Sequence, residues 1–130
     1  MKKIFFVLGI VVMAMTGYRC NNKVVPADGV MKGRLVVKEI CSHFVVEVLN
    51  AKLDTSIVSN GWHDDKRDKI YDQVFTVSNR CGFAAANLKE GDEFEFTFDK
   101  EPPAENCAVC MAFYPTPVKR NAIRISKHDK

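Results

Sequence analysis

The sequence lacks the short motifs that mark the common catalytic and nucleotide-binding sites. It has no glycine-rich phosphate loop, no nucleophile elbow and no His-Glu-x-x-His motif. Histidine is scarce, with three in 130 residues, and no second histidine lies at metal-ligand spacing from His63. Ser42 and His43 are neighbours in a region of strand character, so their side chains point to opposite faces and cannot form a nucleophile–base pair. The sequence therefore predicts a protein that is not an enzyme and uses no cofactor.

Long apolar runs are also rare, and the only one lies at the start of the chain. It covers the twelve residues 4–15 and follows Lys2 and Lys3. This layout is typical of a secretory signal peptide. Twelve residues extend about 18 Å as a helix, which is short of the roughly 30 Å hydrocarbon core of a bilayer. We expect residues 1–19 to be an export signal and predict no permanent membrane span.

The residues after this run bear on how the signal is processed. The segment TGYRC at residues 16–20 resembles the end of a bacterial lipoprotein signal, in which a cysteine after the apolar core receives the lipid and becomes the mature N-terminus. The resemblance implies lipidation at Cys20. The alternative is ordinary cleavage after Thr16, with Ala14 and Thr16 as the pair of small residues.

A polar segment separates Cys20 from the body of the chain. Residues 20–29 contain Pro26 and end in Gly29, which favours an extended tether over a packed element. The resemblance to small exported bacterial lipoproteins implies a lipid-anchored protein of the cell envelope that faces the periplasm or the cell surface. The membrane, through this lipid, is the first predicted partner.

An excess of one charge is absent from the expected mature chain. The formal charge is +3, from 19 basic and 16 acidic residues, but three basic residues lie within 1–19, which leaves 16 of each sign. Nucleic-acid binding needs a net positive field to neutralise phosphates, so we predict no nucleic-acid partner. Basic residues do gather near the C-terminus, where we expect a solvated last strand and a tail at 127–130.

Cysteine is well represented. If Cys20 carries lipid, an even set remains, namely Cys41, Cys81, Cys107 and Cys110. An even set in an oxidising compartment favours two disulfides. Four cysteines allow three pairings, and the sequence does not choose among them. A Cys107–Cys110 bridge, for example, would leave Cys41 to pair with Cys81.

The Cys107-x-x-Cys110 spacing also serves metal and redox chemistry. The four cysteines could form a four-thiolate zinc site, and Cu(I) would accept the same thiolates together with Met111. In this respect the chain is similar in kind to exported copper-handling lipoproteins that carry a Cys-x-x-Cys pair. A thioredoxin-like site would place a helix after the first cysteine, whereas residues 110–114 predict a strand. Soft-metal binding or thiol redox sensing is therefore the alternative function.

The body of the chain predicts strands. From Gly33 onward apolar residues alternate with polar ones, and helical spacing never holds for ten residues. The clearest strand is 93–99, with Phe94, Phe96 and Phe98 on one face. Turn residues separate this strand from the others, and one short helix is expected within 83–88. The other expected strands are 34–40, 43–49, 74–77, 110–114 and 122–126.

The order of these elements resembles an OB-fold, with an early hairpin, a third strand, a short helix and two final strands. The resemblance implies an all-β domain over residues 30–126, built as a five- to six-stranded antiparallel barrel. An immunoglobulin-like β-sandwich is the alternative, although it would need about seven strands.

The insertion at residues 50–72 is the candidate ligand or partner surface. It contains Trp62, His63, Tyr71 and a run of charged residues at 64–69. Loops of this length are uncommon unless they bind something or are disordered. The alternative is that Trp62 covers one end of the barrel while the charges face water. The predicted function is a non-enzymatic binding or assembly module of the envelope for a protein or glycan partner.

Overall fold

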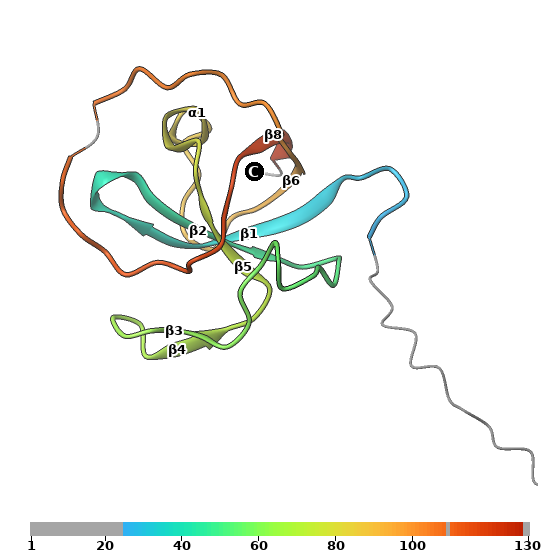
Figure 1. The fold of residues 1–130 in the computed structure, drawn as a ribbon, viewed down its shortest axis with the longest axis horizontal. Coiled ribbons are helices and arrows are strands. Elements are labelled where there is room, and N and C mark those ends of the chain that lie inside the picture. Colours follow the sequence, from blue (N-terminus) through green and yellow to red (C-terminus); the bar gives the residue numbers. More distant parts are fainter. Residues whose placement is uncertain (1–24, 109, 129–130) are drawn as a thin grey trace, which may run out of the picture.

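A computed structural model describes residues 25–108 and 110–128 (Figure 1). The predicted signal, Cys20 and the first half of the predicted tether lie outside the described residues. The end of the tether is a turn in which the Gly29 amide donates to the Pro26 carbonyl at 3.0 Å. The elements follow in the order β1 (Met31–Glu39), η1 (Ile40–Ser42), β2 (His43–Val48), β3 (Trp62–Asp64), β4 (Lys69–Tyr71), β5 (Val74–Val77), α1 (Arg80–Ala84), β6 (Glu93–Phe98), β7 (Arg120–Asn121) and β8 (Ile123–His128).

Six strands form one curled sheet in the order β7-β5-β2-β1-β6-β8. All neighbours are antiparallel except β5 and β7, which are parallel. Although β7 and β8 stand at opposite ends of this order, only Ala122 separates them in the chain. The last segment of the chain therefore pairs with β5 where it begins and with β6 where it continues. The sheet is a half-barrel whose two ends are joined by that segment.

The predicted all-β fold class is confirmed. The structure differs from the expected antiparallel barrel in the parallel pairing of β5 with β7 and in the additional strands β3 and β4 within residues 50–72. Two of the expected elements also differ. The expected strand at 110–114 is wrong, because this segment has no strand partner. The helix covers Arg80–Ala84 and so begins before the expected range of 83–88, because the Asn79 side chain is fixed to β8 by two hydrogen bonds with the backbone of Ile123, at 2.7 and 3.0 Å.

The main core fills the concave side of the sheet. Aromatic rings dominate it, and Phe75, Phe94 and Phe96 are fully or almost fully buried. Gly33 in β1 makes this packing possible: a Cβ there would lie 2.9 Å from Cε1 of Phe96 and 3.0 Å from Cγ1 of Val46. The glycine lets the Phe96 ring lie directly over the backbone of β1.

A second, smaller cluster lies on the other face of the sheet. Strands β3 and β4 form a separate two-stranded hairpin, seen beside β5 in Figure 1. Trp62 and Tyr71 of this hairpin pack against valines of β1, β2 and β5. The insertion at 50–72 is thus an ordered covering of the sheet. In the described part of the chain, no helix has the length and apolar character needed to cross a membrane.

Candidate functional site

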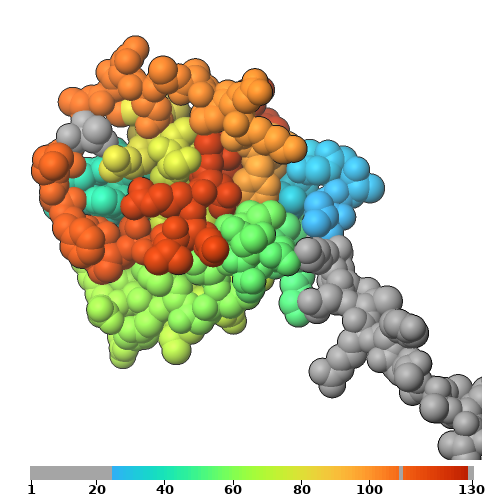
Figure 2. Space-filling model, in the orientation of Figure 1, coloured from blue at the N-terminus to red at the C-terminus, as the bar shows by residue number. Residues whose placement is uncertain are grey.

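Residues 99–119 connect β6 to β7 without helix or strand at their described positions, and we call them the strap. Figure 1 shows the strap, in orange, running outside α1 and outside the turn that joins β1 to β2. In Figure 2 the same segment forms part of the rim of the molecular surface. A segment of this length needs attachments if it is to hold a defined position.

Two disulfides supply the first attachments. Cys107 is bonded to Cys81 in α1, with their Cα atoms 5.9 Å apart, and Cys110 is bonded to Cys41 in η1, with their Cα atoms 5.1 Å apart. The prediction of two disulfides is confirmed, and the pairing that would join Cys107 to Cys110 is excluded. Disulfides persist in non-reducing surroundings, which indicates an environment such as that of exported proteins.

The same pairing bears on the metal and redox alternative. All four cysteines are oxidised, so none is a thiolate ligand or a free redox thiol in this structure. Within residues 25–108 and 110–128, no group of three or more His, Cys, Asp or Glu residues is placed to hold a metal ion.

Hydrogen bonds attach the strap at further points along its length. They bind both backbone and side-chain atoms of the strap to α1, to β2, to the β3–β4 hairpin and to β5. They run from the Cys81 amide to Glu105, from His43 Nε2 to the Ala112 carbonyl, from the Tyr114 hydroxyl to Asp64 and from the Thr76 hydroxyl to the Pro117 carbonyl, at 2.7, 2.9, 2.7 and 2.7 Å. The strap is thus held at both ends and in its middle.

Between these attachments the strap exposes large apolar side chains. Met111 is 98% exposed and Phe113 is 88% exposed, while Ile40, next to Cys41 of the disulfide, is 70% exposed. We call Ile40, Met111 and Phe113 the strap surface. A hollow of about 430 Å³ opens beside it, lined by His43 and residues 113–118 together with Arg120. Exposed apolar side chains gathered in this way are typical of interaction sites.

The backbone of the strap surface is also available. Within the described residues, Met111 and Phe113 form no hydrogen bond through their amides or carbonyls. Cys110, Ala112 and Tyr114, each attached to another part of the domain, alternate with Met111 and Phe113. The segment therefore offers two apolar side chains with a spacing of two residues and unpaired main-chain groups beside them.

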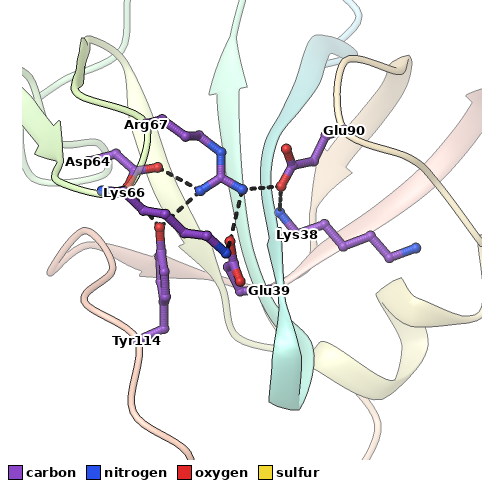
Figure 3. Close-up of polar contacts among 7 residues, drawn as sticks. All are labelled: Lys38, Glu39, Asp64, Lys66, Arg67, Glu90 and Tyr114. Carbon is purple, nitrogen blue, oxygen red and sulfur yellow. Dashed lines mark hydrogen bonds and ion pairs between the residues drawn. The ribbon is translucent and has the colours of Figure 1, made fainter.

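Tyr114 follows Phe113 and is only half-buried, with its hydroxyl in an ion cluster centred on Arg67 (Figure 3). The Arg67 guanidinium donates to Asp64 at 2.9 Å, to the Tyr114 hydroxyl at 2.9 Å and to Glu39 at 3.0 Å, and it also contacts Glu90. Asp64 is only 1% exposed. The cluster ties the hairpin to the strap, to the end of β1 and to the loop before β6.

The cluster holds its members in fixed protonation states. Burial acts to raise the pKa of Asp64, but hydrogen bonds from Tyr114 and Arg67 outweigh it and hold that pKa below its ordinary value. Burial and the Asp64 carboxylate raise the pKa of Tyr114 to about 12. For Arg67, burial opposes the charge, but the three carboxylates raise its pKa. These shifts favour the ionised Asp64 and Arg67 and the neutral Tyr114, which are the forms that their mutual hydrogen bonds require.

The residues that the sequence singled out are only partly brought together. Trp62 and Tyr71 pair across the hairpin with ring centroids 5.9 Å apart, and Tyr71 is buried. His63 points to the opposite face of β3, where Asp65 at 2.8 Å and Asp68 at 3.2 Å raise its pKa. The alternative interpretation, in which the charges of this run face water, is wrong for Asp64, which is buried with Arg67 and Tyr114 as its partners.

The sequence does not reveal the strap surface, because its alternation predicts a strand. A signal was present in Pro115 and Pro117, which follow the segment closely and argue against a central strand. Arg67 carried no signal, since a charged residue in a charged run has no distinguishing pattern.

Comparison with known proteins assigns no family to this chain. No protein-family model, no curated protein and no solved structure significantly matches the chain.

Proposed function

We propose that this protein is an exported, non-enzymatic binding module that holds a protein partner through the strap surface. The observation that carries the proposal is the near-complete exposure of Met111 and Phe113 on a segment bonded covalently to the body of the domain. Burial of such side chains against a partner releases apolar area from water. Because the strap is already ordered, binding does not have to offset the entropy of ordering it.

A protein partner fits this surface better than a glycan. Glycans present hydroxyl groups, which require hydrogen-bond donors and acceptors at defined positions. The side chains of Met111 and Phe113 offer no strong donor or acceptor. Trp62, the aromatic residue of the predicted ligand loop, is stacked on Tyr71 and packed against the sheet. The apolar side chains of the strap instead match the buried anchors of protein–protein interfaces.

The proposal includes the location of the protein. The signal-like residues 1–19 and the cysteine at position 20 support export followed by lipid anchoring in a bacterial envelope. A tether through residue 29 would place the domain at some distance from the membrane, with the strap free to meet a partner.

The proposal can be tested by placing a photo-crosslinking amino acid at position 113 of the full-length protein in the cells that produce it. Position 70 is the matched control, because Ile70 is also exposed, at 64%, but lies on the hairpin. We expect a discrete protein adduct from position 113 alone. Excess purified protein should compete it away, whereas a Met111→Ser, Phe113→Ser variant should not.

Three results would contradict the proposal. These are equal adducts from positions 113 and 70, equal competition by the double variant, and adducts that glycosidases remove but proteases do not. The last result would assign the surface to a glycan.

A further inference from the structure

We propose that the partner is an endopeptidase that prefers large apolar residues, and that residues 110–114 enter its substrate cleft and block it, with Met111 in the primary specificity pocket. This inference rests on the proposed function and names the class of partner. It assigns to the strap the role of a substrate-like inhibitory segment.

The first argument is the form of the segment. Endopeptidases bind their substrates as extended chains, with main-chain hydrogen bonds and pockets for side chains that follow one another along the strand. Residues 111 and 113 present exposed side chains and unpaired main-chain groups, and no strap residue is among the described residues that have a positive φ. The segment therefore has free main-chain groups and no left-handed residue that would keep it from pairing with the edge of a cleft.

The second argument is the attachment on both sides of one peptide bond. Before Met111, the chain is bonded through Cys110 to Cys41. After Met111, the carbonyl of Ala112 is held by His43, and Tyr114 is held by Asp64. Both sides of the Met111–Ala112 bond therefore remain fixed to the same domain.

Attachment on both sides of the Met111–Ala112 bond favours inhibition of the peptidase over digestion of the strap by it. Hydrolysis of the Met111–Ala112 bond adds one water and leaves a carboxylate on Met111 and an amino group on Ala112. Because both new ends stay attached next to each other, they remain in the cleft, and the reverse reaction can expel the water and restore the bond. A flexible substrate has no such restraint, and its two products diffuse apart.

The third argument concerns specificity. Residues 110–114 are Cys, Met, Ala, Phe and Tyr, without any charged side chain. Met111 is unbranched at Cβ and is the more exposed of the two apolar residues. A deep apolar pocket accepts such a side chain, whereas a pocket built for lysine or arginine does not.

The test is a titration of the full-length, oxidised protein against chymotrypsin and, in parallel, against trypsin, with peptide substrates. We expect stoichiometric loss of chymotrypsin activity and no effect on trypsin. Met111→Lys should weaken the inhibition of chymotrypsin at least 100-fold and create inhibition of trypsin. Ile70→Lys is the matched control, since it adds the same charge at an exposed apolar site away from the strap and should change neither result.

Both substituted positions are exposed, so the variants should retain the fold, which their intact mass with two disulfides would verify. The inference is overturned if chymotrypsin cuts the chain at 111–112 with steady turnover. It is also overturned if chymotrypsin is unaffected and Met111→Lys gains nothing against trypsin. In either case, crosslinking from position 113 that purified protein still competes away would mean that only the class of partner is wrong. If this crosslinking is also absent, the proposed function is wrong too.

Discussion

The same residue type performs opposite tasks at two positions of this chain. Phe96 is fully buried in the half-barrel, in ring contact with Phe75, Phe94 and Phe98, whereas Phe113 is 88% exposed on the strap. The first ring stabilises the fold, while the second leaves apolar area in water and so contributes little to stability. Exposure of a large apolar side chain to water, as at Phe113, is expected where the side chain serves to bind a partner.

Replacing Phe96 by alanine should lower the free energy of unfolding by about 3–5 kcal/mol, because it removes a buried ring and leaves a cavity. Phe113→Ala is the matched control and should change it by no more than about 0.5 kcal/mol. Urea unfolding followed by tryptophan fluorescence measures both. Equal losses from the two variants would contradict the assignment of one ring to the core and the other to the surface.

Arg67 is the residue on which the attachment of the hairpin depends. Arg67→Met should destabilise the protein by about 3–5 kcal/mol, because the Asp64 carboxylate would remain buried without its counter-charge and the half-buried Glu39 would lose one of its two cations. Lys66→Met removes another cation bound to Glu39, but Lys66 is 61% exposed, so about 0–1 kcal/mol is expected. Both variants are measured by the same urea unfolding. Similar losses of unfolding free energy from the two would show that the greater burial of Arg67 does not add to its contribution to stability.

At the scale of elements, the hairpin is held to the sheet by ionised carboxylates, and this makes its attachment sensitive to acid. Lysine and arginine partners hold the pKa of Glu39 below its ordinary value of 4.5, and the pKa of Asp64 lies below its ordinary value of 3.8. Since both pKa values are lower in the folded state than in the unfolded state, protonation favours unfolding.

We therefore expect the free energy of unfolding to fall as the pH drops below about 4.5, through the folded pKa values of these carboxylates. Asp64→Asn should reduce the steepness of this fall, because asparagine does not titrate. Urea titrations at a series of pH values measure the slope. A slope unchanged by the substitution would mean that other carboxylates account for the acid sensitivity.

The two disulfides should contribute differently to function although both stabilise the fold. They span 69 and 26 residues of sequence, so in the loop-entropy model each stabilises by about 3–4.5 kcal/mol. Replacing Cys41 and Cys110 by serine should also abolish crosslinking from position 113, because Met111 and Phe113 lose the covalent attachment that lies nearest to them. The pair Cys81 and Cys107 is the matched control and should largely preserve it. Loss of crosslinking in both variants would show that the strap acts as one unit.

Local periodicity accounts for what could be predicted of the elements. The strand at 93–98 and the strand at 74–77 follow from alternation and β-branched or aromatic residues, and both are found almost as expected. Residues 110–114 have the same alternation, but Cys110 and Tyr114 are bound to η1 and to the hairpin, which no local pattern reveals. Likewise, the pairing of cysteines and the burial of Asp64 depend on residues brought from other parts of the chain.

For the whole molecule, the proposed lipid anchor leads to a simple expectation. Cys20→Ala should release the protein from membranes to the soluble fraction, because the lipid would have no cysteine to modify. Fractionation and immunoblotting of cells that express the full chain measure this. Cys81→Ser, which keeps Cys20, is the control and should remain with the membranes. Membrane retention of the Cys20→Ala protein would exclude the anchor.

The joining of β7 to β8 through Ala122 has a consequence for how the protein is made. Strands β1, β2, β5 and β6 can pair with one another, but the open edges of β5 and β6 meet no partner until residues 120–128 are present. A chain that emerges from its N-terminus, from a ribosome or through a translocation channel, can therefore complete this sheet only after residues 120–128 have emerged. Unpaired strand edges are prone to aggregate in the meantime. During synthesis or export from the N-terminus, the sheet thus stays incomplete, and the domain not yet fully folded, until residues 120–128 have appeared.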